Sequence, residues 1–132
     1  MLSSLDYRGV LTVEFFHTEH GLLANEMAPR VHNSGHWTIE GAETSQFENH
    51  LRAVLGWPLG STRARGHAAM LNLLGKLPRV ESMLAIPGAH FHDYGKSARP
   101  GRKVGHCTLV DDDRERLIER LRAVERLVEA VE

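Results

Sequence analysis

The sequence predicts an α+β fold in which short antiparallel strands outnumber the helices. Apolar, β-branched and aromatic residues gather in short runs, each bounded by Gly, Pro or polar clusters, which is typical of strands joined by turns. Only two longer stretches, residues 45–56 and 111–132, space their apolar side chains three and four residues apart, as amphipathic helices do.

The composition excludes several classes of protein. With 132 residues, 42% hydrophobic and 25% charged, the chain is typical of a soluble globular protein. A formal net charge of −1 lacks the basic field that non-specific nucleic-acid binding needs. The apolar runs are far shorter than the roughly 20 residues of a membrane span, and the N-terminus has no signal-peptide pattern. One cysteine, Cys107, fits a reducing compartment, so we expect a cytoplasmic protein with no membrane partner.

The first element predicted is an antiparallel hairpin that carries two acids. If its loop spans residues 18–22, Glu14 lies directly opposite Glu26. Two facing carboxylates repel, and a divalent cation between them reverses the sign of the interaction. Mg²⁺ suits such a site, because it takes one or two carboxylates and shares phosphate oxygens with a substrate, and Asn25 offers a further oxygen. The alternative is that Glu14 faces solvent on an edge strand. The two strands are residues 9–16 and 22–28.

A polar loop, residues 29–37, follows the second strand. Arg30, His32 and Asn33 offer a planar guanidinium fork and directional donors, which suit an oxyanion such as carboxylate, carbonate or phosphate. The alternative is an arginine that caps local carbonyls and a surface histidine. The spacing of His32 and His36 favours zinc only on a helix, and the Asn-Ser-Gly between them is a poor helix former with no cysteine nearby.

A helix and a domain boundary come next. Ser45-Gln-Phe-Glu48 is a capping box, and Gly56 and Pro58 end the helix. The apolar residues on its core face are Phe47, Leu51, Val54 and Leu55. Because residues 57–65 are rich in turn formers, we divide the chain into domains at 1–58 and 59–132.

The second domain is predicted to be β-rich with a terminal helix. Asp111-Asp-Asp113 places negative charge at the start of that helix. Beside its apolar stripe, the charged remainder of the helix is expected to be a solvated face, and the alternative is that the helix mediates self-association. The expected strands are residues 67–74, 89–94 and 103–110, a short helix covers 79–86, and the stripe consists of Leu117, Leu121, Val124, Val128 and Val131.

A basic turn separates the last two strands. Lys96, Arg99, Arg102 and Lys103 surround Pro100-Gly101, and such a turn suits a phosphate monoester. The alternative is an ordinary solvated loop. Gly95-Lys96-Ser97 is not a nucleotide phosphate loop, because the earlier glycine is missing and no helix follows.

Histidines are frequent in the second domain. His90 and His92 share one face of a strand, and His106 lies on the next strand. They form either a ligand set or, more often in proteins, satisfied or exposed side chains. Cys107 beside them is expected to be an inert core thiol rather than a nucleophile.

Several long motifs resemble a known family of enzymes. They are Gly9-Val-Leu-Thr-Val-Glu-Phe-Phe16, the run from Asn25 to Gly41, Ser45 to Glu48, Leu51 to Gly56, Met70 to Gly75, Tyr94-Gly-Lys96 and Arg99 to His106. Together they resemble the 5-(carboxyamino)imidazole ribonucleotide synthetases of purine synthesis, also called the ATPase subunit of phosphoribosylaminoimidazole carboxylase. These are ATP-grasp enzymes, and the resemblance covers roughly residues 5–110.

The resemblance implies a fold and an activity. The fold is the C-terminal part of an ATP-grasp domain followed by a small β-rich domain with a terminal helix. The activity is the ATP-dependent carboxylation of aminoimidazole ribonucleotide by bicarbonate, through carboxyphosphate. A related formate-using purine transformylase fits residues 99–106 less well.

The resemblance also implies roles for the candidate residues. Glu14 and Glu26 would hold Mg²⁺ on the phosphates of ATP. Bicarbonate or carboxyphosphate would be held by Arg30, His32 and Asn33, and the ribonucleotide phosphate by Lys96 and Arg102 together with Lys103. The family's nucleotide-gripping lobes precede these motifs and have no counterpart in this sequence. We therefore expect the chain to be inactive alone; the alternative is a non-catalytic binding or assembly module derived from such an enzyme.

Overall fold

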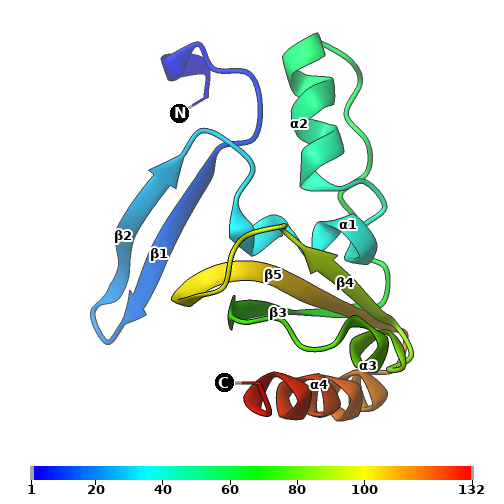
Figure 1. Cartoon of the computed structure of the whole chain (residues 1–132). Coiled ribbons are helices and arrows are strands. Elements are labelled where there is room, and N and C mark those ends of the chain that lie inside the picture. The colour runs from blue at the N-terminus through cyan, green and yellow to red at the C-terminus, as the bar shows by residue number, and fades with distance from the viewer. Residues whose placement is uncertain (1, 132) are drawn as a thin grey trace.

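The computed structural model describes residues 2–131 and confirms the α+β class. A two-stranded hairpin and a helical segment precede a three-stranded sheet, which α4 covers on its lower face in Figure 1. No described helix is long and apolar enough to cross a membrane. In chain order the elements are 3-10 helix η1 (Ser3–Leu5), β1 (Thr12–Thr18), β2 (Gly21–Ala28), 3-10 helix η2 (Asn33–Gly35), α1 (Thr38–Gly41), α2 (Gln46–Leu55), β3 (His67–Gly75), α3 (Val80–Leu84), β4 (Ala89–Asp93), β5 (Arg99–Asp111) and α4 (Arg114–Glu129).

The hairpin places Glu14 opposite Glu26, as the sequence predicts, but its turn and its pairing register differ from the prediction. Its turn is shorter than expected, because Thr18 already pairs with Gly21. That register alone would misalign the acids by one residue. An extra residue in β2, Asn25, forms a bulge beside Glu26 and restores the pairing.

Helix α2 begins and ends where the sequence predicts. The Ser45 hydroxyl accepts the backbone N–H of Glu48 at 3.2 Å, and Gly56 ends the helix with a φ of 69°. The expected core face is not buried within this chain, however. Leu51 is 61% exposed and Leu55 56%, so the amphipathic pattern here marks a face that nothing in residues 2–131 covers.

The sheet has the order β3-β5-β4, and both pairings are antiparallel. Strand β5 starts at Arg99, earlier than expected, so Arg99 and Arg102 lie in the strand rather than in the turn. Gly105 allows the close approach of β4, since a Cβ there would lie 2.4 Å from the carbonyl oxygen of His92.

Helix α4 packs its apolar stripe on the lower face of the sheet, so the stripe is core and not a dimer seam. Val124 is fully buried and Leu117 nearly so. Cys107 belongs to this core, and burial raises the pKa of its thiol to about 11, which makes it the inert thiol that we expected. The buried side chains of the cluster are Leu73, Met83, Val104, Cys107, Leu109, Leu117 and Val124.

The start of α4 is fixed by two aspartates. The Asp113 carboxylate caps the helix by accepting the backbone N–H groups of Glu115 and Arg116. Asp111, at the end of β5, accepts the backbone N–H of Asp113 at 2.8 Å and binds the guanidinium groups of Arg116 and Arg120. These contacts, the backbone hydrogen bond first, hold the pKa of the Asp111 carboxyl below its usual range.

Candidate metal and anion site

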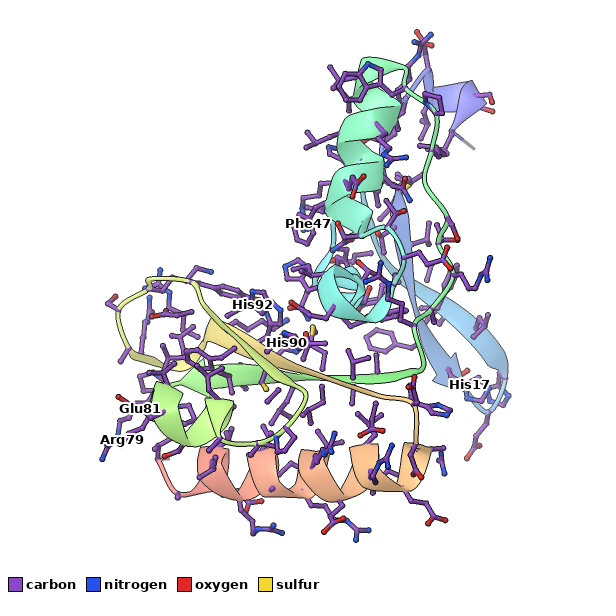
Figure 2. The ribbon with its side chains drawn as sticks, turned by 90° about the vertical axis from the view of Figure 1, so that its right-hand side faces the viewer. His17, Phe47, Arg79, Glu81, His90 and His92 are labelled. Carbon is purple, nitrogen blue, oxygen red and sulfur yellow. The ribbon has the colours of Figure 1, made fainter. Side chains whose placement is uncertain are left out.

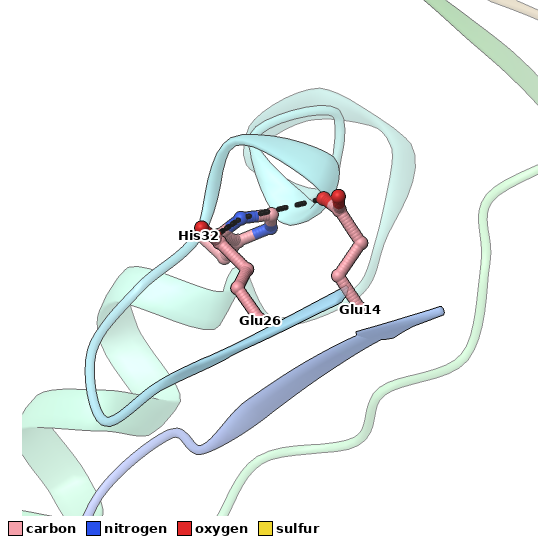
Figure 3. A group of neighbouring side chains, drawn as sticks. All are labelled: Glu14, Glu26 and His32. Atoms are coloured by element: carbon pink, nitrogen blue, oxygen red, sulfur yellow. Dashed lines mark hydrogen bonds and ion pairs between the residues drawn. The ribbon is translucent and has the colours of Figure 1, made fainter. Parts of the chain in front are cut away.

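Three side chains with metal-ligating atoms converge at the open end of the hairpin (Figure 3). One atom each from Glu14, Glu26 and His32 lies within 4.8 Å of the other two. Nε2 of His32 is 2.8 Å from Oε1 of Glu26 and 3.7 Å from Oε2 of Glu14. The two acids therefore point to the same face of the hairpin, as the metal hypothesis requires.

His32 is held rigidly by its neighbours. It is the residue before η2, and its Nδ1 accepts the backbone N–H of Ser34 at 3.3 Å. Gln46, in the first turn of α2, binds both the backbone N–H of His32, at 3.0 Å, and its carbonyl oxygen, at 2.7 Å. Because an N–H group only donates, Nδ1 is an acceptor, and the ring proton lies on Nε2. His32 therefore donates to Glu26 and orients that carboxylate.

Asn25 contacts the acid pair, but as a donor. Its Nδ2 donates to Oε1 of Glu14 at 2.6 Å, so the amide nitrogen orients this carboxylate, while the predicted metal ligand is the amide oxygen. The side chains of Glu14 and Glu26 are 42% and 48% exposed, which leaves carboxylate oxygens accessible from solvent. Hard, oriented and accessible oxygens are the donors that Mg²⁺ prefers, so the residues fit this ion.

The predicted carbonate-binding residues share one loop but are not joined by contacts. Arg30 is exposed, and its Nη1 donates to the neighbouring carbonyl of Val31 at 3.0 Å. Asn33 opens η2 and is half-buried. Only His32 of the three reaches the carboxylates in the part of the chain that the structure describes.

The predicted phosphate-binding residues follow Tyr94 along the β4–β5 connection and into β5. Lys96 places its Nζ 5.0 Å from the centroid of the Tyr94 ring. Arg102 donates from Nη1 to the Ser97 hydroxyl at 3.1 Å and lines an open pocket of about 410 Å³ together with residues 99–101. Lys103 is opposite Leu74, beyond an irregularity in the β3–β5 register.

A partly buried cluster of histidines lies between α1 and the upper face of the sheet, and the sequence pattern indicated it only in part. His92 and His106 stack at 4.2 Å, and Nε2 of His92 is 2.7 Å from Oε1 of Glu40 in α1. Burial, with nearby His92 and His36, lowers the pKa of His106 to about 4. Burial also lowers the pKa of His36, and the charge of Lys103 adds to that shift. The only signal was the shared face of alternate strand residues, and it paired His92 with His90, which is exposed instead (Figure 2).

Comparisons with known proteins agree with this geometry. The ATP-grasp domain model matches residues 1–47, and the phosphoribosylaminoimidazole carboxylase C-terminal domain model matches residues 68–120. The N5-carboxyaminoimidazole ribonucleotide synthase of Pseudomonas aeruginosa is 60% identical over 130 residues. The chain matches part of the N5-carboxyaminoimidazole ribonucleotide synthases. The fold of its second half is accordingly that of the C-terminal domain of these synthases, as the sequence predicts.

Solved structures of such synthases superpose closely. The enzyme from Thermus thermophilus has a TM-score of 0.90 and 63% identity, and the match covers 96% of this chain and 35% of that one. A synthase from Aspergillus clavatus, solved with ADP and 5-aminoimidazole ribonucleotide, has a TM-score of 0.81 and 38% identity, over 92% of this chain and 35% of that one. The match to the Pseudomonas aeruginosa enzyme covers 98% of this chain and 36% of the relative, so the chain spans about a third of the length of these synthases.

Proposed function

We propose that this chain forms part of the active site of an ATP-dependent ligase of purine biosynthesis. The ligase carboxylates aminoimidazole ribonucleotide with bicarbonate, through carboxyphosphate. The convergence of Glu14, Glu26 and His32 carries the proposal, because it assembles a hard-cation site beside the loop of Arg30. It is supported by Aspergillus clavatus relatives solved with ATP, or with ADP and aminoimidazole ribonucleotide.

In this proposal Glu14 and Glu26 hold Mg²⁺, with Asn25 and His32 keeping the two carboxylates in place. When bound, the ion neutralises charge on the phosphates of ATP. His32 keeps Glu26 aimed by donating its Nε2 proton. Both acids have side chains that are more than a third exposed, so the ion can reach their oxygens from solvent.

The anionic substrates are assigned to the cationic segments. Arg30, with Asn33 and His32, is proposed to bind bicarbonate and the carboxyphosphate derived from it, since a guanidinium fork matches a planar oxyanion. Lys96, Arg102 and Lys103 are proposed to bind the ribonucleotide phosphate. Fixed cations at both sites stabilise developing negative charge in phosphoryl transfer.

The domain division is part of the proposal. We assign residues 1–58 to the ATP-grasp domain and 59–132 to the C-terminal domain, which the matched ranges 1–47 and 68–120 support. The proposal also includes a homodimer. Because the stripe of α4 packs on its own sheet, we expect a second copy to bind elsewhere, and analytical sedimentation measures whether it does.

A chimera tests the function. This chain replaces the matching region of the Pseudomonas aeruginosa synthase, which is 60% identical to it. We expect the chimera to hydrolyse ATP only when bicarbonate and aminoimidazole ribonucleotide are both present, and the chain alone to give no turnover. In the chimera, Glu26→Gln is expected to lower kcat by about 100-fold or more, as the loss of a group that stabilises charge does, and Arg102→Ala to raise KM for the ribonucleotide.

The control variant is Glu19→Gln, which removes an exposed acid in the turn of the same hairpin. Its turnover is expected to equal that of the unmodified chimera. A folded chimera that binds the ribonucleotide but never turns over ATP would instead identify the chain as a binding module.

A further inference from the structure

A row of polar side chains crosses the sheet beneath α1, away from the acid pair. Asn72, His106 and His92 are directly opposite one another on β3, β5 and β4, so their side chains emerge on one face. His106, in the middle, is only 1% exposed. Glu40 of α1 contacts His92, so α1 covers this row of side chains.

His106 is a neutral hydrogen-bonding ring in this setting. Its Nδ1 lies 2.7 Å from the hydroxyl oxygen of Tyr94, and its Nε2 has no protein partner in residues 2–131. We assign the ring proton to Nε2, because the Tyr94 hydroxyl can then donate to Nδ1. Nδ1 then accepts, and Tyr94 donates its hydroxyl proton to it. Burial raises the pKa of Tyr94, which keeps that proton in place.

The Tyr94 ring in turn contacts the ammonium group of Lys96. Its ring lies below the Lys96 ammonium, 5.0 Å from Nζ, within the range of a cation–π contact. The turn between them is tight, because Gly95 has a φ of 63° and donates its N–H to the Asp93 carboxylate at 2.7 Å. A tyrosine anchored at its hydroxyl keeps its ring plane fixed. The ring therefore restricts a lysine whose rotamer freedom would otherwise oppose binding.

We propose that His106 is a positioning residue for phosphate recognition. Through the Tyr94 hydroxyl it fixes the ring that holds Lys96, and Lys96 then meets the phosphate monoester of a ribonucleotide. The inference rests on the proposed role of Lys96 in binding that phosphate. It gives a role to a buried histidine whose ring itself never contacts the ligand.

The first experiment needs no ligand. Long-range ¹H–¹⁵N correlation of the ¹⁵N-labelled chain is expected to show His106 protonated on Nε2 and unprotonated on Nδ1. The ε-methylene protons of Lys96 are expected to be shifted upfield by the Tyr94 ring. Tyr94→Phe should reduce that shift. His106→Asn should keep it, because the Asn oxygen stands where Nδ1 stood, and His106→Leu should lose it.

The second experiment measures binding of ribose 5-phosphate by chemical-shift titration. Tyr94→Phe and His106→Leu are each expected to weaken binding about 3- to 10-fold, the loss expected for one hydrogen bond, and His106→Asn to recover most of it. In a Lys96→Met background, Tyr94→Phe should add no further loss, because both act through the same ammonium. The matched control is His90→Asn, at an exposed histidine of the same strand, which should bind as the unmodified chain does.

The outcomes distinguish the positioning role of His106 from the proposed phosphate site. A His106 protonated on Nδ1, or losses from Tyr94→Phe and Lys96→Met that simply add, would overturn the positioning role. A chain that shows the predicted tautomer and ring shift but binds no ribose 5-phosphate would contradict the proposed phosphate site and leave the Tyr94–His106 contact established.

Discussion

Replacing Glu14 with glutamine is expected to stabilise the chain in the absence of divalent cations and to weaken its response to them. The carboxylate oxygens of Glu14 and Glu26 lie within 4.8 Å of each other, and without a cation their charges repel. Glutamine removes one charge and keeps an oxygen that accepts the hydrogen bond of Asn25. The same substitution removes a hard ligand for a cation. It should therefore raise the stability of the chain without a cation and lower the stabilisation that a bound cation gives.

The magnitude follows from the geometry. At 4.8 Å two unit charges repel by about 0.9 kcal/mol in bulk water and by about 3.5 kcal/mol at an effective dielectric constant of about 20. Since the side chains of Glu14 and Glu26 are 42% and 48% exposed, solvent screening favours the lower figure, about 1 kcal/mol. For a chain of 132 residues this is a rise in Tm of about 3–5 °C.

The stabilisation by a bound cation depends on the ratio of its concentration to its Kd. Mg²⁺ or Mn²⁺ at 100 times its Kd stabilises the unmodified chain by about 2.7 kcal/mol, whereas a hundredfold weaker site leaves about 0.4 kcal/mol at the same concentration. The assay is thermal unfolding followed by circular dichroism, with EDTA and then with increasing cation. Glu19→Gln is the control, because it removes one negative charge from the same hairpin outside the pair.

Two results would refute the reasoning. If Glu14→Gln lowers Tm in EDTA, the carboxylates do not repel and the pairing geometry is wrong. If the variant keeps the full rise in Tm with Mg²⁺ or Mn²⁺, these ions bind elsewhere on the chain.

Three further predictions concern stability. Leu73→Ala is expected to cost about 3 kcal/mol in urea unfolding, because Leu73 is fully buried in the core beneath the sheet. Asp111 has a folded pKa below its ordinary value of 3.8, so its contribution is present above that pH and is lost as the pH falls through the folded pKa; Asp111→Asn should flatten this acid limb. His106 is neutral when folded, with a pKa of about 4 against 6.5. The unfolded chain therefore binds more protons in between, and the free energy of unfolding should fall by about 3 kcal/mol from pH 6.5 to 4, a slope that His106→Asn removes.

Local signals predicted most of the secondary structure. The capping box at Ser45, the glycine at position 56 and the acidic start of α4 act through hydrogen bonds within a few residues, so they can be read from sequence. The pairing register of the strands was harder to predict. The predicted pairing of Glu14 with Glu26 is confirmed, but it depends on a bulge at Asn25 that no residue pattern indicated.

The sequence was less informative about what each polar side chain contacts. His32 was predicted to hold an anion, and its hydrogen bonds to Ser34 and Glu26 were not predicted. The contact of Glu40 with His92 was not predicted, because it joins residues 52 positions apart. The hydrogen bond between Tyr94 and His106 was not predicted either, because it depends on the tertiary arrangement of two side chains. The apolar face of α2 was correctly identified, but its burial was not, since periodicity reports a face and not what covers it.

By itself the sequence determined the class of fold, the ends of the longer helices, the opposition of two acids and the family. These follow from short-range hydrogen bonding, from hydrophobic periodicity and from long motifs. Only the tertiary structure decided that His32 orients Glu26, and that the buried His106 bonds the Tyr94 hydroxyl. The physical reason is that hydrogen bonds and pKa values depend on distances between atoms of remote segments, which folding sets and residue order does not record.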